Sequence, residues 1–242
     1  VSSLDAYFRG RKELFKGLAI DVLEKEWTEY PVFQLSFGGE NFIEQGALED
    51  KIDSVISKWE QVYGKAPVSK TFGGRFLHLL QAAHQLTGKK AVVLIDEYDK
   101  PLLDVLDTNM SVTVYGQQFL QEEHHRNILK GFYSVFKEAD RDLRFVLLTG
   151  VTKFSQVSVF SGFNQPADIS LDGRYEALCG ITTEELHSYF KEPINTLALK
   201  YKYSEEEMKD FLKKQYDGYH FGENLIDIYN PFSVLNAFSA QK

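Results

Sequence analysis

The stretch VVLIDE at residues 92–97 decides the fold of this chain, because it joins a short aliphatic run to two adjacent acids. A continuous apolar run of this length is typical of a β-strand that is covered on both faces, as in a parallel sheet. Ligands of such sheets bind beyond the carboxyl ends of the strands. Asp96 and Glu97 are therefore the first residues at which to look for chemistry.

Strands and helices alternate on both sides of this stretch. Strands separated by helices favour an α/β fold, with a parallel sheet, right-handed crossovers and helices on both faces, in three αβα layers. We expect strands at 32–36, 91–95 and 143–148, and helices with apolar stripes at 48–63, 72–86 and 128–136.

The pattern changes to helices after about residue 175. The sequences TTEE at 182–185 and SEEE at 204–207 both match the capping box that opens a helix, and Pro231 suits the start of another. A further short strand is expected at Asp168–Leu171. We therefore predict a core at residues 1–175 and a small helical lid at residues 176–242.

The two strand ends together predict nucleotide chemistry. In phosphoryl transfer, an acid such as Asp96 holds Mg²⁺ against phosphate oxygens, and an acid such as Glu97 orients and deprotonates the attacking water. Thr149 follows the next strand and is the expected contact to the γ-phosphate or the water, with Thr152 or Lys153 as substitutes. This is the layout of a P-loop ATPase core.

Two further acids, Asp99 and Asp104, follow closely. Asp99 precedes Lys100-Pro101, so the residue types favour a helix cap there, and the other interpretation is a cofactor-binding acid. Another hypothesis for the site is a metal-dependent hydrolase that uses Asp96, Glu97, Asp99 and Asp104 directly. It lacks a second cluster of ligands, because the histidines show no standard metal spacing.

The sequence contains no G-x-x-x-x-G-K-[ST] motif, and neither Gly38-Gly39 nor Gly73-Gly74 is followed by Lys-Ser or Lys-Thr. Backbone N–H groups and a lysine from such a loop normally cradle the phosphates. We therefore expect little or no ATP hydrolysis by this chain alone.

Composition limits the other classes of function. The formal net charge is −8, which disfavours non-specific binding to nucleic acid, and 43% of the residues are hydrophobic, which suffices for a core. The single cysteine, Cys179, excludes an internal disulfide and fits a reducing compartment. The apolar runs are too short to cross a bilayer, so we expect a cytoplasmic chain without a membrane partner.

Several motifs resemble the bacterial AAA-ATPase-like family over nearly the whole chain. They are LDAYF at 4–8, KELFKGLAI at 12–20, VLIDEYDKP at 93–101, LTGV at 148–151, YDGY at 216–219 and YNPFS at 229–233.

This resemblance implies a P-loop fold, ATP and Mg²⁺ as cofactors, Asp96 on the magnesium side, Glu97 as base and Thr149 as sensor. It also implies a phosphate-binding loop just ahead of Ser3 and a nuclease-like domain after Lys242, with nucleic acid reached only indirectly. An arginine from a neighbouring subunit or from the lid closes some related sites, and Arg174 is the candidate here. The resemblance thus allows a homo-oligomer.

Two functions follow from the sequence. The first is an ATP-hydrolysing domain that switches conformation. The alternative is a regulatory or protein-interaction module, derived from an ATPase, that does not catalyse.

Overall fold

The computed structural model describes residues 1–152, 166–220 and 226–240. The chain divides into two compact units, Val1–Gln165 and Pro166–Lys242, each of which is described by itself. The boundary expected from the sequence at residue 175 falls inside the second unit.

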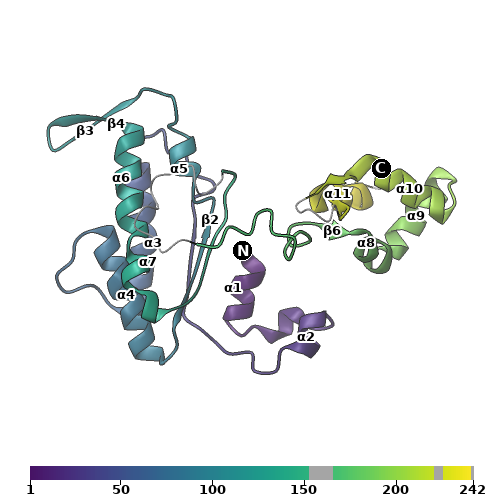
Figure 1. Cartoon of the computed structure of the whole chain (residues 1–242), viewed down its shortest axis with the longest axis horizontal. Coiled ribbons are helices and arrows are strands. Elements are labelled where there is room, and N and C mark those ends of the chain that lie inside the picture. Colours follow the sequence, from purple (N-terminus) through teal and green to yellow (C-terminus); the bar gives the residue numbers. More distant parts are fainter. Residues whose placement is uncertain (153–165, 221–225, 241–242) are drawn as a thin grey trace. The chain divides into compact units, whose positions relative to one another are not determined.

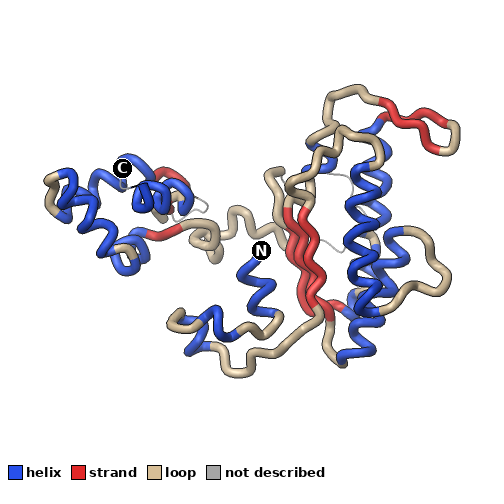
Figure 2. The backbone as a smooth tube through the Cα atoms, turned by 180° about the vertical axis from the view of Figure 1, so that it is seen from behind, coloured by secondary structure: helices blue, strands red, loops and turns tan. Residues whose placement is uncertain are grey.

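The first unit is built on a parallel sheet of three strands, which confirms the three strands expected from the sequence. These strands are β1 (Val32–Ser36), β2 (Ala91–Asp96) and β5 (Leu143–Leu148), in the order β1-β2-β5. The sheet is the group of strands at the centre of Figure 2. The register pairs Ser36 with Asp96, and Ile95 with Leu148. All three strands therefore end at the same edge of the sheet.

Helices cover both faces of this sheet, so the α/β class is confirmed. On one face the core contains Phe33, Leu35, Val93 and Ile95 from the strands. The helices on that face are α3 (Ala47–Tyr63), α4 (Phe72–Thr87), α6 (Gln121–Tyr133) and α7 (Val135–Glu138) (Figure 1).

The opposite face is covered near the start of the chain. Val32, Val92 and Leu94 point to this face and contact Leu4 and Phe8 of α1 (Ser2–Phe8). The 3-10 helix η1 (Lys12–Phe15) and α2 (Ala19–Leu23) lead from α1 towards β1. Alternate residues of each strand thus serve two separate cores, as expected of a sheet buried between two layers.

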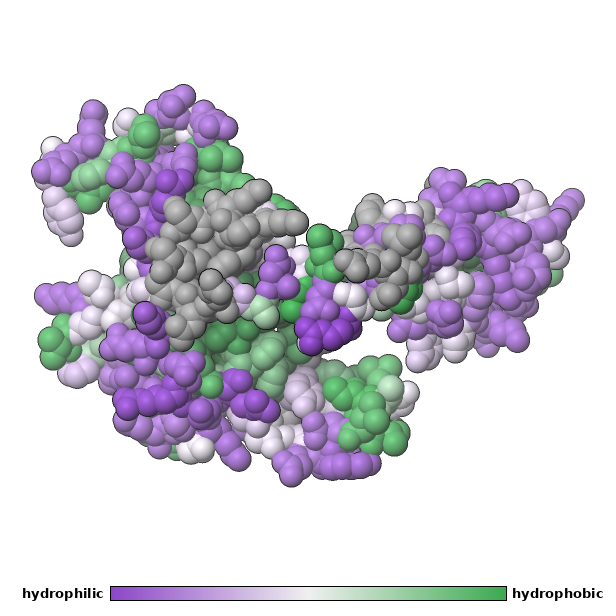
Figure 3. Space-filling view, viewed as in Figure 1, coloured by the Kyte–Doolittle hydropathy of each residue, from purple (hydrophilic) through white to green (hydrophobic). Residues whose placement is uncertain are grey.

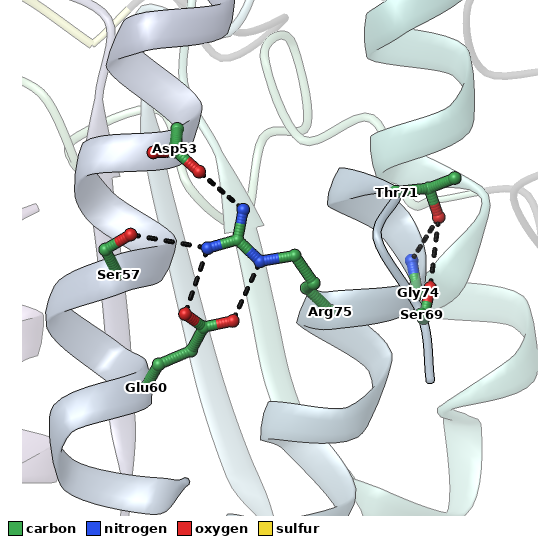
Figure 4. Close-up of polar contacts among 7 residues, drawn as sticks. All are labelled: Asp53, Ser57, Glu60, Ser69, Thr71, Gly74 and Arg75. Atoms are coloured by element: carbon green, nitrogen blue, oxygen red, sulfur yellow. Dashed lines mark hydrogen bonds and ion pairs between the residues drawn. The ribbon is translucent and has the colours of Figure 1, made fainter. Parts of the chain in front are cut away.

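A buried ion pair joins α3 to α4 (Figure 4). The guanidinium of Arg75 donates to both carboxylate oxygens of Glu60, at 2.8 and 3.0 Å, and to Asp53 at 2.5 Å. Only 7% of Glu60 is exposed. The hydrogen bonds from Arg75 lower the pKa of the Glu60 carboxyl, so the pair is charged at neutral pH.

Thr71 and Gly88 set the two ends of α4. The Thr71 hydroxyl accepts the amide of Gly74 at 3.1 Å, which caps the first turn (Figure 4). Gly88 closes the helix with φ +65°, the left-handed conformation that glycine adopts without strain.

Along the chain, a hairpin that the sequence did not predict connects β2 to β5. Its strands are β3 (Ser111–Val114) and β4 (Gln117–Leu120), which pair only with each other among the described residues. The hairpin follows the short helix α5 (Lys100–Leu103) and projects past the ends of the helices (Figures 1 and 2).

The second unit is mainly helical, as expected. Its helices are α8 (Thr183–Tyr189), α9 (Lys191–Tyr201), α10 (Glu205–Tyr216) and α11 (Pro231–Ala240). The short strands β6 (Ile181–Thr182), β7 (Asp217–Tyr219) and β8 (Ile228–Tyr229) form a small antiparallel sheet.

Both predicted capping boxes are present in the second unit. The hydroxyl and amide of Thr182 exchange hydrogen bonds with Glu185, and those of Ser204 do the same with Glu207. The predicted strand at 168–171 is wrong. The carboxylate of Asp168 accepts the amide of Ser170 at 3.0 Å, which bends the chain into a turn.

Exposed apolar side chains gather over η1 and α2 (Figure 3), where Leu14, Leu18, Val22 and Leu23 are all more than half exposed. Among the described residues, no helix has the length and apolar content that a membrane span requires.

Candidate functional site

The ends of β2 and β5 meet through a pair of side chains. The Thr149 hydroxyl donates a hydrogen bond to Oδ1 of Asp96. Backbone pairing also continues past the strands, since Thr149 N–H donates to the Ile95 carbonyl at 2.9 Å and Tyr98 N–H donates to the Thr149 carbonyl at 3.0 Å. The structure therefore brings together two of the residues that the sequence singled out.

Glu97 stands at the rim of the sheet in an unusual backbone conformation. Its φ is +53°, in the left-handed region that non-glycine residues rarely adopt, and its side chain is exposed. Strained backbone of this kind is concentrated at functional sites. Its carboxylate oxygen Oε1 approaches Gly38, in the loop that follows β1.

The loop after β1 contacts Glu97. Phe37 N–H donates to the Asp96 carbonyl at 3.0 Å and places Gly38 beside the acid. A Cβ added at Gly38 would lie only 2.7 Å from Oε1 of Glu97, so a larger residue here would displace the Glu97 carboxylate from its present position. In the sequence, Gly38-Gly39 stands out only as a glycine pair that lacks the Lys-Ser or Lys-Thr of a phosphate-binding loop, and nothing in it predicts this close approach.

Asp99 is buried, with 1% of its surface exposed, and fastens the loop after β5. Its Oδ2 accepts three hydrogen bonds: from Val151 N–H at 3.0 Å, and from the N–H and hydroxyl of Thr152, both at 2.6 Å. Asp99 occupies the N-cap position of α5, as its residue type suggested, but its side chain makes no capping bond to that helix. A cofactor-binding role for Asp99 stays a prediction.

Tyr98 completes this attachment. Its hydroxyl donates to the Thr152 carbonyl at 2.7 Å. A Cβ at Gly150 would lie 2.5 Å from Oδ1 of Asp99 and 2.6 Å from the Tyr98 ring. The loop that carries Thr149 is therefore held against Tyr98 and Asp99, the residues that follow Glu97. The lack of a side chain at Gly150 lets this loop and these residues approach closely.

The acids after β2 do not converge on one point. Asp104 pairs with Lys100 at 2.9 Å and accepts the amide of Phe42 at 3.2 Å, while Asp99 is engaged with the loop after β5. Among the described residues, no three Asp, Glu, His or Cys side chains are grouped as a metal site would need. The geometry therefore gives no support to a hydrolase that binds its metal with protein ligands alone.

Asp96 fits a different way of holding a cation. Magnesium is commonly bound by one or two carboxylates, with water and substrate phosphates as the remaining ligands. One oxygen of Asp96 is fixed by Thr149, and this leaves the second carboxylate oxygen to face a ligand. A single carboxylate that is oriented by a threonine hydroxyl is compatible with an ion held in this way.

The structure does not test whether the remaining two candidates belong to this group. Arg174 lies in the second unit, where its guanidinium forms a forked pair with Asp172 at 2.6 to 3.1 Å and lowers the pKa of that carboxyl to about 2. Lys153 lies outside the described residues.

An α/β domain with an acid pair and a threonine at one edge of its parallel sheet is the class of protein that these observations define. A family model described as "Predicted AAA-ATPase" matches residues 1–160, and the chain belongs to this AAA-ATPase-like family.

A curated relative agrees over the whole chain. An uncharacterised protein of the vnfD 5′ region in Azotobacter chroococcum mcd 1 is 35% identical over 244 residues, which is all of this chain and 43% of that protein. The chain thus spans less than half of the length of this relative. No solved structure matches this chain.

Proposed function

We propose that this chain is the part of an ATP-hydrolysing domain that handles magnesium and the attacking water. The hydrogen bond from Thr149 to Asp96 carries the proposal, because it joins the ends of two neighbouring parallel strands at the edge where such sheets bind ligands. Membership of the AAA-ATPase-like family supports nucleotide as the ligand.

The roles follow from position. Asp96 would hold the cation through its free carboxylate oxygen, and Thr149 would keep that carboxylate in one orientation. When bound, Mg²⁺ neutralises charge on the phosphate oxygens as the γ-phosphoryl group is transferred.

Glu97 would accept a proton from the attacking water. Its exposed carboxylate lies at the rim of the sheet beside Gly38. A base has to reach the attacking water, and an exposed carboxylate at this rim is accessible to it. The second unit and Arg174 would act as a lid.

The experiment is a Glu97→Gln substitution in the full-length protein, with ATP turnover and ATP binding measured separately. Loss of a general base reduces turnover by roughly 100- to 10,000-fold, while ATP binding stays at the wild-type level. Glu138→Gln is the matched control, since Glu138 is an exposed acid on α7. Turnover of the Glu97 variant at the wild-type rate would remove Glu97 from this role.

A further inference from the structure

The β3–β4 hairpin stands apart from the sheet and ends in an exposed aromatic ring. Its register pairs Val114 with Gln117, so the turn is the two residues Tyr115 and Gly116, both with positive φ, +49° and +79°. This is the primed turn that suits a tight hairpin, and its first position favours Asn, Asp or Gly. An aromatic residue there is strained.

Tyr115 is completely exposed, at 102% of its reference area. A ring that is fully solvated and sits in a strained position contributes nothing to the stability of the hairpin. Tyrosine is also enriched in recognition surfaces, where it offers a large, rigid contact area. The tip therefore has the character of a contact made with another molecule.

The strand edges are unprotected as well. No charged residue occurs from Thr108 to Gln121, in a chain in which 26% of the residues are charged. Natural edge strands usually carry charges or prolines that prevent another strand from pairing. In this register the backbone groups of Thr113 and Gln118 point outward, one on each edge. Each edge thus offers N–H and C=O groups to an added strand.

The base of the hairpin is firmly held. Gln121 N–H donates to the Met110 carbonyl at 2.8 Å, and the buried Gln121 amide donates to the carbonyls of Phe42 and Ile43, both at 3.0 Å. Strand β4 runs directly into α6, and Val112 is buried. An edge that is already ordered loses little conformational entropy when a strand pairs with it.

The charge around the hairpin selects the kind of partner. Acids flank the uncharged stretch, with Asp107 before it and Glu122 and Glu123 after it. Asp107 and Glu123 are exposed, and Glu122 is already paired with Arg126. Phosphates would be repelled here and would find no Lys or Arg on the hairpin itself. A basic residue beside the base would be attracted.

We propose that the β3–β4 hairpin is a docking arm for an extended segment of another protein. The segment adds as a strand to one edge, it is uncharged along the paired stretch, and it places a Lys or Arg at the end that lies over Asp107 and Glu123. Tyr115 packs on its other end. This mode of recognition takes its affinity from backbone hydrogen bonds and its specificity from the flanking side chains.

The experiment selects binders from a random peptide library displayed on phage and measures the synthesised peptides by calorimetry against four variants. Thr113→Pro and Gln118→Pro each remove one outward N–H without breaking a bond within the hairpin. Tyr115→Asn removes the ring and suits the turn better. Tyr189→Asn is the matched control, since Tyr189 is an exposed tyrosine on α8.

We expect one of the two proline variants to weaken binding at least ~10-fold and so to identify the edge, and Tyr115→Asn to weaken it by a similar factor. Tyr189→Asn should bind as the wild type does, and the selected peptides should carry a basic residue at one end. Unchanged binding in both proline variants would overturn the proposal, as would a selection without hairpin-dependent peptides. Tyr115-dependent binding of a single-stranded DNA probe would overturn it in favour of nucleic acid.

Discussion

The Thr149 hydroxyl at the end of β5 is hydrogen-bonded to the Asp96 carboxylate at the end of β2. The two residues are 53 positions apart in sequence, and the parallel pairing of Ile95 with Leu148 brings them together. The bond fixes the plane of the Asp96 carboxylate and leaves one of its oxygens for a ligand. Thr149 is thus tied to the acid within the fold itself.

Thr149→Val tests this link, because valine keeps the shape of threonine and removes the hydroxyl. We expect the full-length protein to lose about 10- to 100-fold in activity or in magnesium affinity, which is typical when a residue that orients a ligating carboxylate is lost. The measurement is ATP turnover as a function of magnesium concentration. Thr149→Ser retains the hydroxyl and should restore the wild-type dependence. A valine variant with unchanged magnesium dependence would separate Thr149 from the cation.

Asp99→Asn should loosen the loop after β5. The three hydrogen bonds that Oδ2 accepts are assisted by its negative charge, and this assistance is lost in the neutral amide. We expect the amides of Val151 and Thr152 to exchange hydrogen faster, and the free energy of unfolding to fall by about 2 kcal/mol.

Asp104→Asn is the control for this change, since the partners of Asp104 are the ammonium of Lys100 and the amide of Phe42, not Val151 or Thr152. It should leave exchange at Val151 and Thr152 unchanged. If Asp99→Asn also left their exchange unchanged, Asp99 would not be what fastens the loop.

The effect of an added methyl group should differ in sign between two glycines. Gly150→Ala would place its Cβ against Oδ1 of Asp99 and the Tyr98 ring, and we expect it to lower the free energy of unfolding by about 1–3 kcal/mol. Gly131→Ala, within α6, meets open space and should raise it by up to about 1 kcal/mol, because alanine favours helix. Urea denaturation followed by the fluorescence of Trp27 and Trp59 measures both. A tolerated Gly150→Ala would show that the loop can move aside.

The edge of the sheet was predictable from the sequence because its signals are local. The apolar run at 91–95 identified β2, and the carboxyl ends of parallel strands necessarily share one edge, so Asp96 and Thr149 had to be close. Length and periodicity were equally sufficient for α3 and α4. These inferences needed no knowledge of side-chain partners.

What the sequence did not reveal depends on distant partners. The donors to Asp99 lie 52 and 53 residues further along the chain, so the proline after Lys100 suggested a cap instead. The hairpin was missed because Tyr115-Gly116 is an uncommon turn sequence and its strands carry mixed polar residues. The approach of Gly38 to Glu97 has no sequence signal beyond the glycine itself.

Acid should destabilise the first unit partly through the ion pair between α3 and α4. The pKa of Glu60 is lowered in the folded chain by its hydrogen bonds with Arg75, from an ordinary value of 4.5. A carboxyl with a depressed folded pKa contributes stability that is fully present above its unfolded pKa, and this stability is lost as the pH falls through the folded pKa. The contribution of Glu60 is therefore complete at neutral pH and declines below about pH 4.5.

Arg75→Met isolates this contribution. Removal of one partner leaves the buried Glu60 carboxylate unpaired, and we expect the free energy of unfolding at pH 7 to fall by about 3 kcal/mol. Arg126→Met is the matched control, because the pair of Arg126 with Glu122 lies within one helix and is more exposed, so its loss should cost less than about 1 kcal/mol. The measurement is urea denaturation, followed by tryptophan fluorescence, at pH 7 and at an acidic pH below the ordinary pKa of Glu60. The difference between the wild type and Arg75→Met should shrink at the acidic pH, because Glu60 is then protonated in the variant. A difference that stayed constant with pH would mean that Arg75 stabilises the two helices by packing and not by charge.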